Sequence, residues 1–113
     1  MKKPLSGRVV CITGAGRGLG RALAEAFAAE GCQLVLAARS SGEIDELAAR
    51  LGNAVAVQTD VRVAADVDRL VEAAVAEFGR LDIMVNNAGL AVYGPVEGTS
   101  PDAVDAMIDT NVK

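Results

Sequence analysis

The sequence predicts an α/β fold in which a parallel sheet is covered by helices on both faces. The first observation is that, along the 113 residues, short apolar runs alternate four times with segments of helical character; the others are the composition of these runs and the shortness of the turns between them. Each run is hydrophobic throughout, as expected of a strand that is buried on both faces of a parallel sheet. Short turns join these segments, and strand–helix–strand units of this kind form right-handed crossovers between parallel strands.

Four strands are predicted from the apolar runs. They cover residues 8–13, 32–38, 54–59 and 81–86. Three strand–helix units wound in one direction, followed by a reversal, give the strand order 3-2-1-4 of a Rossmann-like three-layer sandwich. Because no linker, repeat or low-complexity segment interrupts the alternation, we expect residues 1–113 to form a single domain.

Four helices are predicted, over residues 18–30, 43–51, 65–78 and 101–112. The first begins inside a glycine-rich turn, and Ser40 with Glu43 forms the pattern of a capping box before the second. The third has the clearest apolar stripe, formed by Val67, Leu70, Val71, Ala74, Val75 and Phe78. Ser100 and Pro101 suit the start of the fourth. A glycine that can take a left-handed conformation follows each of the first three helices, at Gly31, Gly52 and Gly79.

The turn after the first strand has the composition of a phosphate-binding loop. It reads Thr13-Gly14-Ala15-Gly16-Arg17-Gly18-Leu19-Gly20. Glycines let backbone N–H groups approach a phosphate closely, and a helix N-terminus offers unpaired N–H groups and a positive dipole end. The general G-x-G-x-x-G pattern fails here, as does the P-loop pattern, but T-G-x-x-x-G-x-G fits. The alternative is a glycine-rich turn that binds no ligand.

Three further segments follow in order along the chain. Asp60-Val61 comes after the third strand, Asn86-Asn87-Ala88-Gly89 after the fourth, and Asn111 lies in the last predicted helix. Each has a plain structural explanation: a turn-capping carboxylate, amides that satisfy a strand end, and a residue on a helix surface. Together with the glycine loop, however, these motifs resemble the short-chain dehydrogenase/reductase family in type and in spacing.

The resemblance implies a nicotinamide dinucleotide site and assigns residues to it. The cofactor loop contributes Thr13, Gly14, Arg17, Gly18, Leu19 and Gly20. Asp60 corresponds to the adenine-contacting aspartate of the family, with Val61 beside it in the site, and Asn87, Ala88 and Gly89 belong to the motif after its fourth strand. Asn111 is the one catalytic position of the family that this chain contains.

The end of the second strand favours NADP(H) over NAD(H). An NAD site usually carries an acidic residue there for the ribose 2′-OH, whereas this chain has Ala38 followed by Arg39. A guanidinium can bind a 2′-phosphate through paired, charge-assisted hydrogen bonds, and Arg17 offers a second cation. The alternative is that both arginines are solvent-exposed surface charges.

Composition excludes several classes of function. The net charge of −4 and the isoelectric point of about 4.7 argue against general nucleic-acid binding. No apolar run approaches the roughly 18 residues of a membrane span, and no signal peptide follows the basic N-terminus, so we expect a cytoplasmic protein. Cys11 and Cys32 are expected to be buried free thiols. With no histidine, we expect neither a metal site nor a Ser-His-Asp triad.

The resemblance also implies catalytic residues that this chain lacks. The family uses a tyrosine in a Y-x-x-x-K motif together with a serine, but four residues after the single tyrosine, Tyr93, comes Glu97. The last predicted helix reaches Lys113 without a glycine or proline stop. We therefore expect an N-terminal portion that stops before a fifth parallel strand, binds NADP(H) weakly or not at all, and is inactive alone.

Two functional hypotheses remain open. In the first, the chain is the cofactor half of an NADP(H)-dependent carbonyl reductase or alcohol dehydrogenase. In the second, it is a non-catalytic module that folds, binds nucleotide or oligomerises. A Rossmann-like methyltransferase is disfavoured because Ala38-Arg39 supplies no acid after the second strand. The edge of the fourth strand, expected to be unpaired, and the apolar last helix predict a homo-oligomer, most simply a two-fold dimer.

Overall fold

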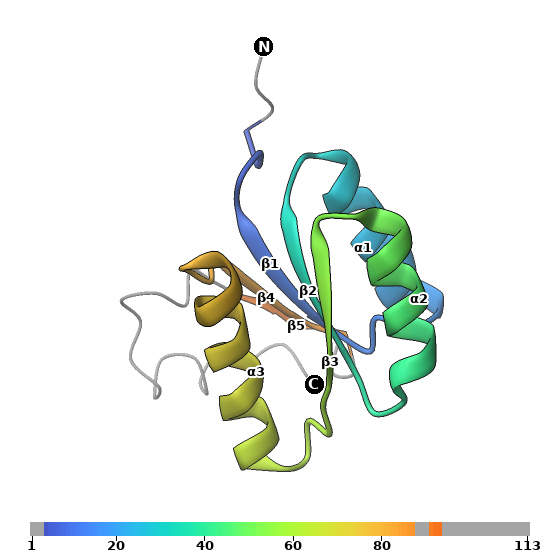
Figure 1. Cartoon of the computed structure of the whole chain (residues 1–113), viewed down its shortest axis with the longest axis vertical. Helices are drawn as coiled ribbons and strands as arrows, with labels where there is room; N and C mark the ends of the chain where they lie inside the picture. Colours follow the sequence, from blue (N-terminus) through green and yellow to red (C-terminus); the bar gives the residue numbers. More distant parts are fainter. Residues whose placement is uncertain (1–3, 88–90, 94–113) are drawn as a thin grey trace.

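The strand β1 (Val9–Thr13) is the centre on which the rest of the sheet is arranged (Figure 1). It pairs in parallel with β2 (Gln33–Ala38) on one side and with β4 (Ile83–Asn86) on the other. β3 (Ala54–Gln58) extends the sheet beyond β2, also in parallel. The predicted order 3-2-1-4 of four parallel strands is therefore confirmed.

A fifth strand, β5 (Ala91–Tyr93), is an addition that the sequence did not predict. It pairs antiparallel with β4, with Met84 opposite Tyr93. The computed structural model describes residues 4–87 and 91–93, and within them the prediction of an unpaired β4 edge is wrong. The reason is local: antiparallel neighbours need only a short connection, and valine and tyrosine suit an extended backbone. Homo-oligomerisation stays a prediction, and the last predicted helix lies outside the described residues.

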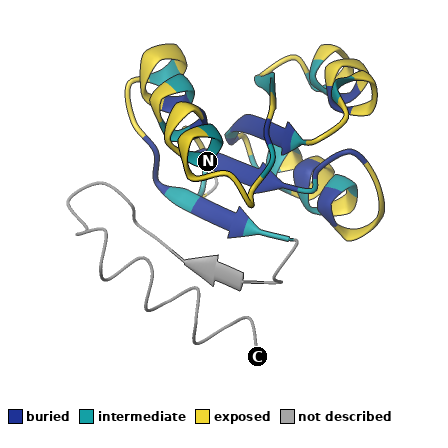
Figure 2. Cartoon of the chain, turned by 90° about the horizontal axis from the view of Figure 1, so that it is seen from below, coloured by how far each residue is buried: buried dark blue, intermediate teal, exposed yellow. Residues whose placement is uncertain are grey.

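Helices cover both faces of the sheet, as predicted, with α1 (Gly18–Ala29) and α2 (Ser41–Leu51) on one face and α3 (Ala64–Phe78) on the other (Figures 1 and 2). Alternate residues of β1 pack in the hydrophobic clusters on the two faces of the sheet. Val9 and Cys11 pack in the cluster that contains Leu70 and Ala74 of α3. The other cluster contains Val10, Ile12, Ala24, Leu34, Leu36, Ile44 and Leu47. Since side chains alternate along a strand, this double burial explains why the run is apolar throughout.

The ends of the helices follow the glycine pattern but not the predicted capping box. Gly52 and Gly79 end α2 and α3 with positive φ angles of 85° and 81°. Ser40 is the N-cap residue of α2, yet its side chain makes no capping hydrogen bond. The predicted capping box is therefore wrong, because Glu43 lies instead beside Arg17 across the neighbouring turn.

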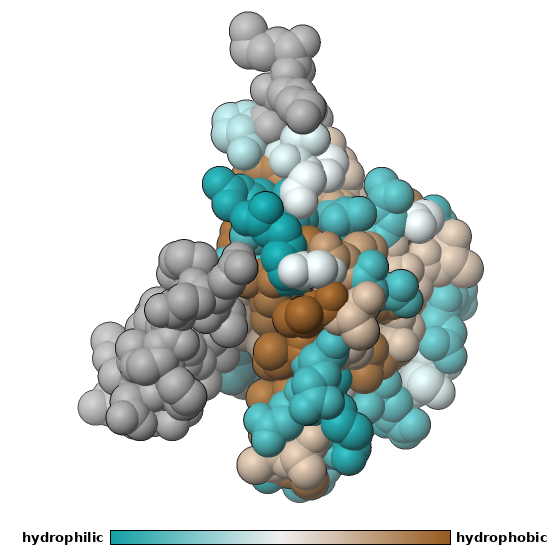
Figure 3. All heavy atoms as spheres, turned by 60° about the vertical axis from the view of Figure 1, so that its left-hand side comes forward, coloured by the Kyte–Doolittle hydropathy of each residue, from teal (hydrophilic) through white to brown (hydrophobic). Residues whose placement is uncertain are grey.

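Apolar side chains gather on the α3 side of the molecule and are framed by polar ones (Figure 3). Val75 of α3 is 49% exposed, while Leu70 and Ala74 of the same helix are fully buried. Only part of the apolar stripe predicted for this helix therefore packs on the sheet, and Val75 lies outside that part. Among the helices of the described residues, none combines the length and apolarity that crossing a membrane requires.

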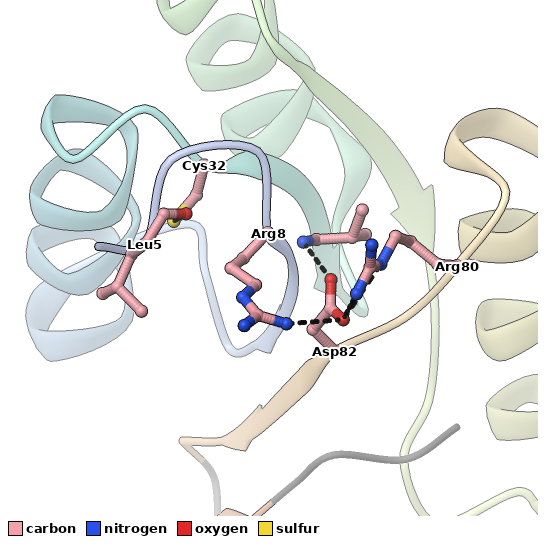
Figure 4. A network of polar contacts seen from close by, with 6 residues as sticks. Leu5, Arg8, Cys32, Arg80 and Asp82 are labelled. Atoms are coloured by element: carbon pink, nitrogen blue, oxygen red, sulfur yellow. Dashed lines mark hydrogen bonds and ion pairs between the residues drawn. The ribbon is translucent and has the colours of Figure 1, made fainter. Parts of the chain in front are cut away.

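A buried carboxylate joins β1 and β4 at the amino ends of these strands (Figure 4). Asp82 Oδ2 accepts a 2.8 Å hydrogen bond from the Val9 N–H, and the Asp82 N–H donates to the Val9 carbonyl at 3.0 Å. Arg80 Nε donates to Asp82 Oδ1 at 3.0 Å, and Arg8 lies 3.5 Å from the same oxygen. Burial alone would raise the pKa of Asp82, but the hydrogen bonds from Val9 and Arg80 outweigh it and lower that pKa.

We predict that Asp82→Asn lowers the free energy of unfolding at pH 7 by about 1–3 kcal/mol, because a charge-assisted buried interaction is lost. A carboxyl with a lowered pKa stabilises the fold above its ordinary pKa and loses that effect as pH falls through the lowered value. The difference between the two proteins should therefore shrink below about pH 4. Urea unfolding at several pH values measures it.

The matched control is Asp45→Asn, since Asp45 is exposed on α2. It should leave stability within about 0.5 kcal/mol of the parent chain. Equal effects of the two variants at pH 7, or an Asp82→Asn effect that persists unchanged to pH 2.5, would contradict the prediction.

Candidate functional site

The carboxyl ends of β1, β2 and β3 open into a cavity of about 450 Å³. Its walls come from the turn after β1, from the end of β2 with the start of α2, and from the turn after β3. The lining residues are Gly14, Gly16, Arg17, Ala37, Ala38, Arg39, Ser40, Glu43, Thr59, Asp60, Val61 and Arg62. In open parallel sheets ligands bind beyond the carboxyl ends of the strands, beside the point where the strand order reverses. This cavity is therefore the candidate site.

The turn after β1 and the start of α1 leave little room for a side chain at two glycines. Gly14 has a φ of +62°, and a Cβ there would lie 2.9 Å from Asn87 Nδ2. A Cβ on Gly20 would lie 2.0 Å from the Gly14 carbonyl oxygen. Gly18 has open space around it, but its φ of +59° is one that residues with a Cβ rarely adopt. The sequence motif thus encodes a close approach between α1 and its own preceding turn.

Thr13 and Asn87 tie this turn to the end of β4. The Thr13 hydroxyl donates to Asn86 Oδ1 at 3.1 Å and accepts from the Asn87 N–H at 3.1 Å. Asn87 Nδ2 donates to the Gly14 carbonyl at 3.2 Å. Both residues are predicted site residues, but in this structure they buttress the glycine loop, and neither lines the cavity.

The start of α1 has the features of an anion-binding helix terminus. Arg17 is its N-cap residue, with extended backbone and no side-chain capping hydrogen bond. The first N–H groups of a helix lack partners within the helix, and an uncapped terminus leaves them available to an anion. Leu19, in the first turn, is 55% exposed. The terminus and the glycine turn together can surround a phosphate with backbone donors.

Three arginines and two carboxylates line the cavity, so its lining is more cationic than the chain as a whole, whose net charge is −4. Arg17 Nε lies 4.0 Å from Glu43 Oε1, and the Arg17 side chain is 86% exposed. Arg39 is exposed, and its carbonyl accepts a 2.8 Å hydrogen bond from Gln58 Nε2. The guanidinium of Arg39 makes no hydrogen bond or ion pair with residues 4–87, so it can bind an added anion.

Asp60 is held by a neighbouring arginine that the sequence interpretation did not single out. Arg62 Nε donates to Asp60 Oδ1 at 3.0 Å and Arg62 Nη2 to Asp60 Oδ2 at 2.9 Å. The Arg62 N–H also donates to Oδ1, at 3.0 Å. These bonds lower the pKa of Asp60 to about 2, so the carboxylate stays ionised through the physiological range. The available signal was the spacing of two residues between acid and base.

The structure brings together some of the predicted site residues and not others. Gly14, Arg17, Arg39, Asp60 and Val61 line the cavity. Gly18, Leu19 and Gly20 form the start of α1, next to it. Ala88, Gly89 and Asn111 lie outside the described residues. Glu43 and Arg62 line the cavity without having been predicted.

Comparison with known proteins connects this geometry to a family. The family model described as short chain dehydrogenase matches residues 8–113. An uncharacterized oxidoreductase of Methylorubrum extorquens is 39% identical over 113 residues, which covers 96% of this chain and 46% of that protein. Galactitol 2-dehydrogenase of Agrobacterium fabrum is 39% identical over 110 residues, covering 96% of this chain and 43% of the enzyme. The chain thus spans less than half the length of these relatives.

Solved structures agree with the sequence relatives. A 3-ketoacyl-(acyl-carrier-protein) reductase from Brucella melitensis, complexed with NADH, superposes with a TM-score of 0.71 at 38% identity, covering 92% of this chain and 43% of that one. A hydroxysteroid dehydrogenase from Escherichia coli has a TM-score of 0.71 at 27% identity, covering 75% of this chain and 37% of that one.

We predict that Gly20→Ala lowers the free energy of unfolding by about 1–3 kcal/mol or more, because its Cβ would overlap the Gly14 carbonyl. Gly42→Ala is the matched control. It adds the same methyl group within α2, where nothing lies within 4 Å of the new Cβ. Since alanine favours helix over glycine, this control should be neutral or stabilising by up to about 1 kcal/mol. Urea unfolding, followed by circular dichroism, measures the free energy of unfolding of both variants. Equal values for the two variants would contradict the close approach at Gly20.

Proposed function

This chain belongs to the short-chain dehydrogenase/reductase family, and we propose that its cavity binds the adenosine half of NADP(H). The observation that carries the proposal is the charge of the residues that line the cavity. Arg17 and Arg39 lie there, and Ala38 stands where an NAD site would carry a carboxylate. The wider proposal is that the chain is the cofactor part of an oxidoreductase that moves hydride between NADP(H) and a carbonyl or alcohol.

The residues present fit such a cofactor. Gly14 and Gly20 let the turn after β1 pack closely against the start of α1, and this helix begins without a side-chain cap, so its first N–H groups are available to a pyrophosphate. All four proposed contacts line the cavity, and we assign Asp60 and Val61 to the adenine and Arg39 with Arg17 to the 2′-phosphate. When bound, the nicotinamide ring of this cofactor donates or accepts hydride. The chain's own contribution here is binding and orientation.

NADP(H) is a finer proposal than nicotinamide dinucleotide binding in general. The Brucella melitensis neighbour was solved with NADH, which supports the class of cofactor but not the 2′-phosphate. The preference is inferred from charge: a dianionic 2′-phosphate gains from an exposed guanidinium and meets no carboxylate at position 38. Activity on a substrate is proposed for the whole protein, because the chain spans less than half of its relatives.

We predict that isothermal titration of the 113-residue chain gives tighter binding of NADP⁺ than of NAD⁺. Arg39→Ala should weaken NADP⁺ binding about tenfold and leave NAD⁺ binding within about twofold, because only NADP⁺ carries the phosphate that Arg39 would bind. Arg50→Ala is the control, since Arg50 pairs with Glu25 between α2 and α1 and does not line the cavity.

Equal affinity of the parent chain for the two cofactors would overturn the NADP(H) preference. Binding of neither cofactor would overturn the proposed nucleotide site as a whole. A loss of NADP⁺ affinity that Arg50→Ala reproduced would assign the effect to net charge instead of to Arg39.

Glu43 should oppose the 2′-phosphate. Its side chain is 49% exposed, lines the cavity and lies 4.0 Å from Arg17 Nε. Glu43→Gln removes a like charge and releases Arg17, so NADP⁺ affinity should rise about twofold to fivefold while NAD⁺ affinity stays unchanged. Glu46→Gln, at an exposed position of α2 away from the cavity, should change neither. An unchanged NADP⁺ affinity of Glu43→Gln would show that Glu43 does not face the phosphate.

A further inference from the structure

We propose that Arg62 determines the base specificity of the cavity by holding the Asp60 carboxylate in one orientation, so that it accepts from adenine and rejects a 6-oxo purine. This inference rests on the nucleotide site proposed above. It assigns a positioning role to a residue that lines the cavity and that neither the glycine loop nor the 2′-phosphate argument uses.

The Asp60 carboxylate is fixed from two sides. Arg62 contacts both of its oxygens with a planar guanidinium and adds a third bond from its backbone N–H. On the main-chain side, the Asp60 N–H donates to Asp66 Oδ2 at 2.9 Å, which anchors the residue to the first turn of α3. A guanidinium fork fixes the plane of a carboxylate, which a single hydrogen bond does not.

The hydrogen bonds also determine what the carboxylate can still accept. An ionised carboxylate has about four acceptor positions, two on each oxygen. Oδ1 receives both the Nε and the backbone N–H of Arg62, whereas Oδ2 receives only Nη2. One position therefore remains, on Oδ2. It suits a single N–H donor, such as the exocyclic amine of adenine, and repels the carbonyl oxygen that hypoxanthine carries at the same place.

Arg62 differs in this respect from the other cavity arginines. Its guanidinium is engaged with Asp60 at 2.9 and 3.0 Å, whereas Arg17 lies 4.0 Å from its carboxylate neighbour. The Arg62 side chain is 72% exposed and that of Asp60 27%, and both residues line the cavity, so a base inside the cavity can reach the pair. Arg62 thus acts through Asp60, and its removal should change selectivity between bases.

The test is titration of the full chain with NADP⁺ and with its hypoxanthine analogue. The parent chain should prefer the adenine form. Arg62→Gln should reduce this preference about threefold to fivefold, mainly through weaker binding of the adenine form. Arg50→Gln, which breaks an exposed arginine–glutamate pair remote from the cavity, should keep it. Arg62→Lys keeps the positive charge but loses the paired guanidinium contact with Asp60, so it should also reduce the preference for the adenine form.

The outcomes separate this inference from the proposed function. If the parent chain binds neither nucleotide, the site itself fails and the inference fails with it. If it binds and Arg62→Gln or Arg62→Lys keeps the full preference for adenine, only the inference is overturned. An NMR titration of the Asp60 carboxyl carbon without nucleotide tests the clamp directly. Arg62→Gln should raise the pKa of Asp60 from its lowered value, and an unchanged pKa would overturn the clamp.

Discussion

The candidate site depends on the close contact between the Gly14 carbonyl and α1 at Gly20. No side-chain atom fits between them, since a Cβ on Gly20 would come within 2.0 Å of that oxygen. The contact fixes the angle at which the helix leaves β1, and hence where its uncapped N-terminus lies relative to the sheet. The same angle sets the crossover to β2, whose end forms the next wall of the cavity.

Polar ties at both ends of β1 keep this arrangement in place. At the amino end, Asp82 pairs with both backbone groups of Val9. At the carboxyl end, Thr13 and Asn87 join the glycine turn to β4. Every residue of β1 is buried, so these two ties hold a strand that is enclosed along its whole length.

The sequence predicted the backbone of this protein better than the pairing of its side chains. Apolar runs and helical stripes are local signals, and they placed the four parallel strands and three helices of the described residues. The antiparallel β5 was missed because a strand of three residues carries almost no periodicity. The capping box failed because Glu43 faces Arg17 from the neighbouring turn. The Arg62 fork was also missed, although Asp60 and Arg62 are only two residues apart, because that spacing does not show whether the two side chains turn toward each other.

The three arginines of the cavity differ in how strongly neighbouring carboxylates engage them, and this difference underlies the separate roles proposed for them. Arg62 is committed to Asp60, and Arg17 has Glu43 as a neighbour at 4.0 Å, so the attraction that each exerts on an added anion is partly offset. The guanidinium of Arg39 makes no hydrogen bond or ion pair with residues 4–87, although it attracts the Asp60 carboxylate from a longer distance, and the Arg39 carbonyl accepts a hydrogen bond from Gln58. Of the three arginines Arg39 is thus the one whose hydrogen-bond donors are not used by a carboxylate among these residues, and they can bind a phosphate. Discrimination by phosphate should thus depend mainly on Arg39, and discrimination by base on the Arg62–Asp60 pair.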